Sequence, residues 1–207
     1  MQNAAGRDPD LITLQQYVSD MLALETHIEQ TLDGQRNVVR DHPASSLAVQ
    51  RFETVSRDQR EALRRHLNDL GGPPDTGGLM GQAQALVKTS VTTAAGIAAG
   101  AINAVRTQRV AKALRDDFTA FSHAVVSYAM LTTTAALLEH QPTAELAERH
   151  LQAWEGAIEE IAGLIPEVVS WELRRDGRVI DDHRVGAAAE RLTRIWRIPE
   201  DGTQRAA

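Results

Sequence analysis

The sequence predicts an all-α protein built on four long helices. Apolar residues recur at spacings of three and four over most of the chain, which is the period of an amphipathic helix. Pro- and Gly-containing breaks divide this pattern into segments of helix length. No segment shows a comparable strand pattern, since Arg178-Val179-Ile180 is too short. With 207 residues the chain is long enough for one domain with a sizeable core.

The first predicted helix begins at Asp8-Pro9, because Asp caps free amides and Pro in the first turn loses no hydrogen bond. Gly34 weakens the helix, but the pattern resumes through Val38 and Val39. The predicted buried face contains Leu11, Leu14, Val18, Met21, Ile28 and Leu32.

Asp41-His42-Pro43 ends the first helix and starts a second, which continues to about Leu70. Its predicted apolar face contains Leu47, Phe52, Val55, Leu63 and Leu67. Residues 71–78 are a loop of glycines and prolines, and residues 79–105 are predicted to form crossover helices rich in Ala, Gly and Thr.

A third long helix is predicted from about residue 107 to 139, and a fourth from about 143 to 171 with a kink at Pro166. The third helix has Leu114, Phe118, Phe121, Val125, Tyr128, Thr132 and Ala135 on one face. The inner face of the fourth contains Leu146, Ala153, Ala157, Ile161, Leu164 and Val168.

A short amphipathic helix should follow Asp181 or Asp182, with Val185, Ala188, Leu192, Ile195 and Trp196 on its apolar side. We therefore expect an N-terminal tail (1–9), a helical bundle (10–172) and a C-terminal extension (173–207). One long crossover between the second and third helices is typical of four-helix bundles with ferritin-like connectivity.

Composition excludes several classes of function. The formal net charge of −6 does not suit a nucleic-acid binder, which needs a basic face. The absence of Cys excludes disulfides, thiolate metal sites and thiol nucleophiles. Residues 89–105 and 118–138 lack Asp, Glu, Lys and Arg, but the first run is too short for a membrane span and the second is too rich in Ser and Thr. We expect a cytoplasmic protein that binds neither nucleic acid nor membrane.

Motifs for catalysis are missing from the sequence. It contains no phosphate-binding loop, no dinucleotide fingerprint and no Gly-x-Ser-x-Gly elbow. A di-metal centre in a helical bundle needs Glu-x-x-His pairs, which bring a carboxylate and an imidazole onto one face. None of the seven histidines follows such an acid: the residues three positions earlier are Leu24, Val39, Leu63, Ala120, Leu137, Ala147 and Ile180.

Glu25 is the one acid that falls on a predicted buried face, between Met21 and Ile28. A buried carboxylate needs a metal, an arginine, a hydrogen-bond donor or a proton, because an unpaired buried charge is expensive. Glu25 is therefore either a metal ligand or an edge residue that reaches solvent or an arginine of the second helix. The arginines in question are Arg57, Arg60 and Arg64.

Two segments resemble a known family. Residues 22–29 (LALETHIE) and 52–59 (FETVSRDQ), the latter leading to Leu70-Gly71, are similar to the first two helices of YciE/YciF-type ferritin-like proteins. The likeness extends more weakly through Val125–Tyr128 and the helix from Glu145, and covers about residues 10–170. This resemblance implies a ferritin-like bundle, usually dimeric, associated with bacterial stress responses and a di-metal site.

The resemblance also implies that the metal site has decayed. Glu25 matches the first-helix Glu and Gln59 a second-helix Gln, so these two are vestigial metal-ligand candidates. Elsewhere the expected acidic positions hold other residues: Val55 in the second helix, Val126 and Ala129 in the third, and Trp154 and Ile158 near those of the fourth. We therefore expect no catalytic residue, metal or cofactor, and a non-catalytic protein that acts through self-association or partner binding. The alternative is a residual iron-binding or peroxide-handling protein that uses Glu25 and iron.

The sequence offers four interface candidates, Gly96, Gly100, Trp171 and Trp196. Gly96 and Gly100 lie one turn apart, a spacing that lets another backbone approach closely, either from the same chain or from a second copy. The two tryptophans and the arginines of the C-terminal extension suit a contact with its own bundle, a second subunit or a protein partner. We expect a homodimer or a higher homo-oligomer. Residues 79–105 leave open a role at a membrane surface.

Overall fold

The computed structural model describes residues 8–74 and 109–196, and these ranges are helical apart from short turns. The predicted all-α class is therefore confirmed. Within these two ranges the helices are α1 (Pro9–Val39), α2 (Pro43–Asp69), α4 (Arg109–Leu137), α5 (Gln141–Arg175) and α6 (Asp182–Trp196). The expected crossover helices at 79–105, including Gly96 and Gly100, and the later part of the 71–78 loop lie outside the described residues.

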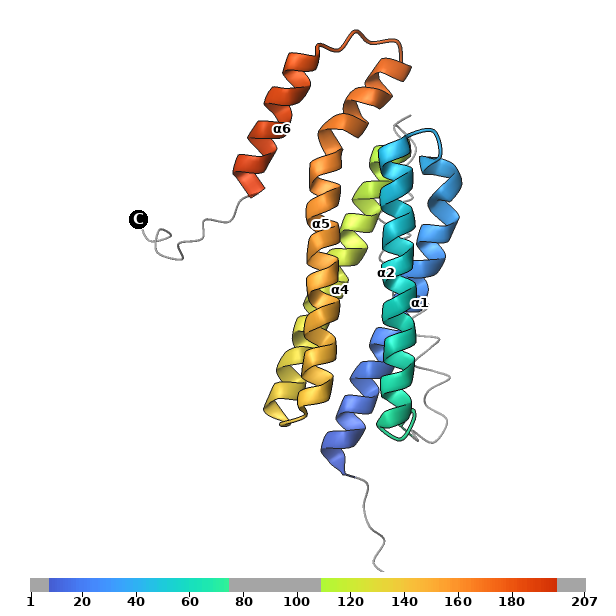
Figure 1. The fold of residues 1–207 in the computed structure, drawn as a ribbon, viewed down its shortest axis with the longest axis vertical. Helices are drawn as coiled ribbons and strands as arrows, with labels where there is room; N and C mark the ends of the chain where they lie inside the picture. The colour runs from blue at the N-terminus through green and yellow to red at the C-terminus, as the bar shows by residue number, and fades with distance from the viewer. Residues whose placement is uncertain (1–7, 75–108, 197–207) are drawn as a thin grey trace, which may run out of the picture.

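Four long helices lie side by side around one core (Figure 1). The chain forms two antiparallel hairpins, α1 with α2 and α4 with α5, and each hairpin packs along the other through α1–α4 and α2–α5 contacts. The α2–α5 contact is the least extensive of these four. Because α2 and α4 run in the same direction, the end of α2 and the start of α4 lie at opposite ends of the molecule.

Helix starts follow the capping signals of the sequence. Asp8 accepts a hydrogen bond from the Asp10 amide at 3.0 Å, and Pro9 opens α1 as predicted. The start of α4 is capped from another helix, since the carboxylate of Glu172 accepts hydrogen bonds from the Val110 and Ala111 amides at 2.7 and 3.3 Å. A negative charge at this position also complements the positive end of the helix dipole.

Glycines end α2. Gly71 and Gly72 adopt φ of 91° and 89°, a left-handed conformation that only glycine adopts at little cost. Their amides donate to the carbonyls of Asn68 and Leu67, which closes the last turn. The side-chain amide of Gln15 donates to the Leu70 carbonyl at 2.7 Å and ties this turn to α1.

The core agrees with most predicted apolar positions, with one clear error. Phe52, Phe121 and Trp154 form its aromatic centre: Phe121 stacks on Trp154 at 4.2 Å and meets Phe52 edge to face at 5.2 Å. Leu47, predicted to be in the core, is 55% exposed, and Ala48 and Val49 are buried instead. The apolar face of α2 at its start is turned by one to two residues from the prediction because adjacent Leu, Ala and Val fit either register.

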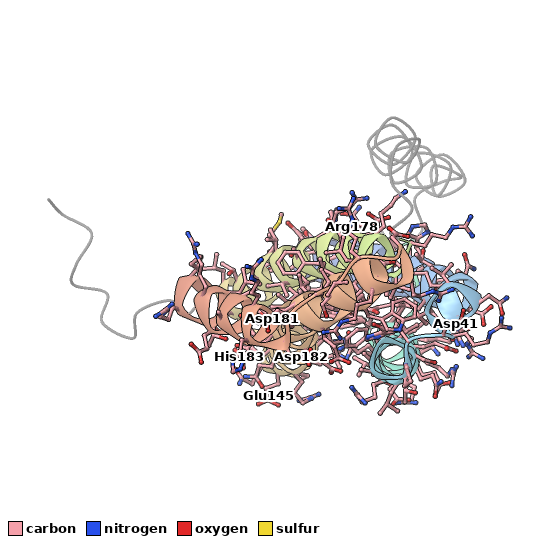
Figure 2. All side chains as sticks on the ribbon, turned by 90° about the horizontal axis from the view of Figure 1, so that it is seen from above. Asp41, Glu145, Arg178, Asp181, Asp182 and His183 are labelled. Carbon is pink, nitrogen blue, oxygen red and sulfur yellow. The ribbon has the colours of Figure 1, made fainter. Side chains whose placement is uncertain are left out.

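The last two helices extend beyond the predicted bundle. α5 continues through Pro166 to Arg175 and bends in its C-terminal part, in keeping with the predicted kink (Figure 1). α6 packs on α5 through Val185, Ala189 and Leu192, which are half-buried, whereas the predicted contacts Ala188 and Ile195 are exposed. Seen from above, Asp181, Asp182 and His183 at the start of α6 lie across the molecule from Asp41 in the α1–α2 turn (Figure 2). Among the described helices, none is both long enough and apolar enough to span a bilayer.

Truncation of two leucines on α2 tests the corrected core face. Leu63 is fully buried, so Leu63→Ala should lower the free energy of unfolding by about 2–5 kcal/mol through lost burial and a residual cavity. Leu47→Ala, at an exposed site, should change it by about 0.5 kcal/mol or less. Urea denaturation measures both, and similar losses for the two variants would contradict the assigned face.

Candidate functional site

The centre of the bundle holds a polar cluster to which each of the four long helices contributes at least one side chain. The cluster is organised around Glu25 of α1, which is fully buried. Both of its carboxylate oxygens have partners within 2.8 Å. The partners are Ser56 of α2, Tyr128 of α4 and Trp154 of α5.

The two oxygens of Glu25 have different surroundings. Oε1 accepts hydrogen bonds from the Tyr128 hydroxyl and the Trp154 indole N–H, both at 2.8 Å. Oε2 lies 2.8 Å from the Ser56 hydroxyl, which is also 2.9 Å from the backbone carbonyl oxygen of Glu25. Because phenol and indole donate strongly, Oε1 has both lone pairs satisfied without a cation.

Burial raises the pKa of Glu25 to about 7, although the hydrogen bonds from Trp154, Ser56 and Tyr128 favour the charged form. The geometry also accommodates the neutral acid. A proton on Oε2 can be donated to the Ser56 oxygen while the Ser56 hydroxyl donates to the Glu25 carbonyl. Every polar atom of the carboxyl group then keeps a partner, which is what a buried acid requires.

His150 of α5 extends the cluster toward α2. Its Nδ1 lies 3.1 Å from the Tyr128 hydroxyl oxygen. Burial lowers the pKa of His150 to about 4, so the ring is neutral, and burial next to Glu25 raises the pKa of Tyr128 well above its usual value. Because the Tyr128 proton points to Glu25, His150 Nδ1–H donates to the Tyr128 oxygen. Gln59 donates from its side chain to the His150 carbonyl at 3.3 Å.

Neither sequence-based interpretation of Glu25 described this arrangement. The expectation that it reaches solvent or pairs with Arg57, Arg60 or Arg64 is wrong, because Glu25 is buried and its partners are neutral. Arg57 and Arg60 instead bind Glu29, and Arg57 also binds Glu53. Tyr128, predicted on the inner face of the third long helix, is fully buried, and its hydroxyl contacts both Glu25 and His150.

The positions assigned to metal ligands by the family resemblance do not converge. Val126 and Ala129 face outward, Val55 and Ile158 are half-buried, and only Trp154 meets Glu25. Gln59 is buried but bonds to the His150 backbone. Within residues 8–74 and 109–196, no group of three or more His, Asp or Glu side chains is placed to hold a metal ion.

A second buried acid, Asp117 of α4, pairs with Gln35 of α1. The Gln35 side-chain amide donates to Asp117 Oδ1 at 2.8 Å, while Asp117 Oδ2 and Gln35 Oε1 are buried without a partner. Burial raises the pKa of Asp117 to about 7. A proton on Oδ2 suits this geometry, because a protonated acid can return a hydrogen bond to the amide oxygen. Asp117 lies one residue before the uncharged run 118–138, and its helical register with Leu114 and Phe121 was the signal for its burial.

Of the two tryptophans proposed as interface residues, the structure describes the side chain of Trp171 but not that of Trp196. Trp171 is half-buried and packs within its own chain: its ring meets His42 edge to face at 5.1 Å and lies 4.7 Å from the Arg175 guanidinium. Trp196 is the last residue of α6, and its side chain lies outside the described part of the structure.

Comparison with known proteins gives a fold but no family. No protein-family model matches the chain, and no curated protein matches it either. A crystal structure of a protein from Xanthomonas campestris pv. campestris is similar to this chain, with a TM-score of 0.64 and 17% identity. The match covers 83% of this chain and 100% of that one, so the likeness extends over most of the helical fold.

The Glu25 cluster predicts a specific pH dependence of stability. The pKa of Glu25 is raised in the folded state, so folding takes up a proton and stability falls as pH rises from about 4.5 to about 7. Glu25→Gln preserves the shape and can donate to Ser56, so it should match the wild type at pH 5 and exceed its stability at pH 8 by on the order of 3 kcal/mol. Denaturant melts at both pH values provide the measurement.

Asp117 provides a second test. Its pKa is also raised by burial, so it too makes the stability of the fold fall as pH rises. Asp117→Asn should remove the contribution of Asp117 to this pH dependence. The double variant should instead lose stability as pH falls below about 6.5, because burial lowers the pKa of His150 and of His66 in the folded state. A Glu25→Gln variant that loses stability equally at pH 5 and pH 8 would show that the cluster needs a permanent negative charge.

Proposed function

We propose that this chain is a non-catalytic, ferritin-like helical protein that acts by self-association. The observation that carries the proposal is the state of Glu25, whose carboxyl group is held by three uncharged donors from three other helices. A carboxyl group with its oxygens so occupied links the four helices and has little capacity left for an ion or a substrate.

The helix arrangement supports the ferritin-like part of the proposal. Two antiparallel hairpins in which the second and third long helices run in the same direction need one long connection, as in ferritin-like bundles (Figure 1). The chain provides 34 residues between Pro74 and Arg109 for this connection.

The outer face of α4 supports the self-association. Val126, Met130 and Leu137 on this face are 61%, 52% and 78% exposed. Between Phe118 and Leu138 the sequence has no Asp, Glu, Lys or Arg, so the exposed side of α4 there is uncharged over about five turns. A continuous uncharged face on a helix of a monomeric protein is unusual, and such faces mark interaction sites.

The negative charge of the chain favours a second copy of the same chain as the partner that binds the outer face of α4. The chain carries a net charge of −6, and α5 beside α4 exposes Glu148, Glu155 and Glu159. Two copies repel wherever acids face each other, and the outer face of α4 is where they can meet without that cost. The intrachain contacts of Trp171 and α6 leave this face as the better supported interface.

A charge placed on the α4 face should dissociate the oligomer. We expect Met130→Glu to convert a dimer to a monomer, because an apolar contact would become a buried like-charge pair. Size-exclusion chromatography with light scattering measures the mass. Val179→Glu, at a fully exposed apolar site outside α4, is the control and should leave the mass unchanged. A wild-type monomer, or a dimer unaffected by Met130→Glu, would refute this interface.

Metal analysis tests the non-catalytic part against the alternative of an iron-binding or peroxide-handling protein that uses Glu25. Protein purified from cells supplemented with iron and manganese should contain far less than one tightly bound ion per chain. About two ions per chain, as in a di-metal centre, would overturn the proposal. Glu25→Gln is the matched variant, since loss of bound metal in this variant alone would place the ion at Glu25.

A further inference from the structure

Two of the long helices begin with the same uncommon cap. α2 begins within His42-Pro43-Ala44-Ser45 and α5 within His140-Gln141-Pro142-Thr143. Each helix has a histidine at the N-cap and a hydroxyl residue three positions later. The usual caps are Ser, Thr, Asp and Asn, whose oxygens accept hydrogen bonds at any pH near neutrality. An imidazole can take this role only through an unprotonated ring nitrogen.

His42 caps α2 and also contacts α5. Its Nδ1 accepts a hydrogen bond from the Ser45 amide at 3.2 Å and lies 2.9 Å from the Ser45 hydroxyl. Its ring, almost fully buried, packs against Trp171 of α5, and its Nε2 points to the Glu167 carboxylate at 3.5 Å. In the neutral ring with its proton on Nε2, Nδ1 is an acceptor for α2 and Nε2–H faces Glu167.

His140 repeats this arrangement with the helices exchanged. Its Nδ1 accepts from the Thr143 amide at 3.4 Å and lies 2.8 Å from the Thr143 hydroxyl oxygen. That hydroxyl is in turn 2.7 Å from Nε2 of His66 on α2. The Thr143 hydroxyl donates to His140 and accepts from His66, so the cap of α5 is bonded to α2.

The two caps lie at opposite ends of one interface, because α2 and α5 are antiparallel. This α2–α5 interface is the least extensive of the four lateral contacts of the bundle. Between its ends it is bridged by the Gln59–His150 hydrogen bond and the Arg51–Glu160 ion pair. The histidine caps therefore link α2 and α5 at both ends of the least extensive contact between the two hairpins.

We propose that His42 and His140 form a proton-sensitive latch that releases the ends of the α2–α5 interface under mildly acidic conditions. A proton on Nδ1 would replace the acceptor of the capping amide with a donor, and would place a positive charge at the positive end of the helix dipole. Histidine is the side chain that functions as a switch near physiological pH, and the usual Ser, Thr, Asp and Asn caps lack this property.

Nearby charges modulate each end of the latch. Near His42 the acids are Glu167 of α5 and the adjacent Asp41, which is bonded to Arg175. Near His140 are the adjacent Glu139 and, on α2, His66. The pKa of His66 is lowered by burial and by His140, while Asp69 acts in the opposite direction. The inference does not depend on the proposed self-association.

Amide hydrogen exchange tests the latch residue by residue. Between pH 7.5 and pH 5.5, after correction for intrinsic rates, protection of the Ser45 and Thr143 amides should fall about fivefold or more, the equivalent of losing a cap. The buried acids Glu25 and Asp117 stabilise the fold toward acid pH, so they cannot produce this loss.

His140→Asn provides a cap that does not titrate and should abolish the acid sensitivity at Thr143 while leaving that at Ser45. His123→Asn, at an exposed histidine in the middle of α4, is the matched control and should leave both unchanged. Unchanged protection in the wild type between the two pH values would overturn the proposal. So would equal acid sensitivity at Thr143 in wild type and His140→Asn.

Discussion

A carboxyl group in the centre of the bundle imposes the strongest constraint on this structure. Glu25 cannot be buried without partners, and the donors that satisfy it come from three separate helices. Sliding or rotating any of the four helices by one residue would leave at least one donor or acceptor unpaired in the core. Apolar packing of Leu, Ile, Val and Ala tolerates such shifts more easily. The polar cluster therefore specifies the register of the four helices relative to one another more strictly than the aliphatic core does.

The sequence predicted the helices well because their signals are local. Asp8-Pro9, Asp41-His42-Pro43 and the Gly71-Gly72 turn mark boundaries through backbone chemistry within a few residues, and the structure places helix ends close to each of them. The inward orientation of Glu25 also followed from periodicity in a single helix. The error at Leu47 arose where three consecutive apolar residues satisfy more than one helix face.

The partners of Glu25 could not be predicted in the same way. Ser56, Tyr128 and Trp154 lie 31, 103 and 129 residues away in sequence, and their convergence depends on how the helices align in space. An arginine of the second helix would have been the partner of a charged carboxyl group. In the structure the partners of Glu25 are neutral hydrogen-bond donors, and the geometry also accommodates the neutral acid. The histidine caps had a sequence signal, since His-x-x-Ser and His-x-x-Thr each contain a proline near a helix start, but histidine is rarely considered as a cap.

In the proposed ferritin-like framework, Trp154 explains how a metal site becomes a structural centre. It lies near a fourth-helix position where the family resemblance implies an acid, and its indole N–H donates to Glu25. A cluster of carboxylates attracts a cation. When one of these acids is replaced by a hydrogen-bond donor, the remaining carboxyl group is satisfied by donors and needs no cation. In this proposal the cluster is structural, and the outer face of α4 is the proposed surface for self-association.

A crystal structure of the protein grown in the presence of iron and manganese, with anomalous data for both metals, tests this account most directly. The account predicts electron density for Ser56, Tyr128 and Trp154 within hydrogen-bond distance of Glu25 and no anomalous peak among the four helices. An anomalous peak at bonding distance from Glu25, with Tyr128 or Trp154 turned away, would contradict it.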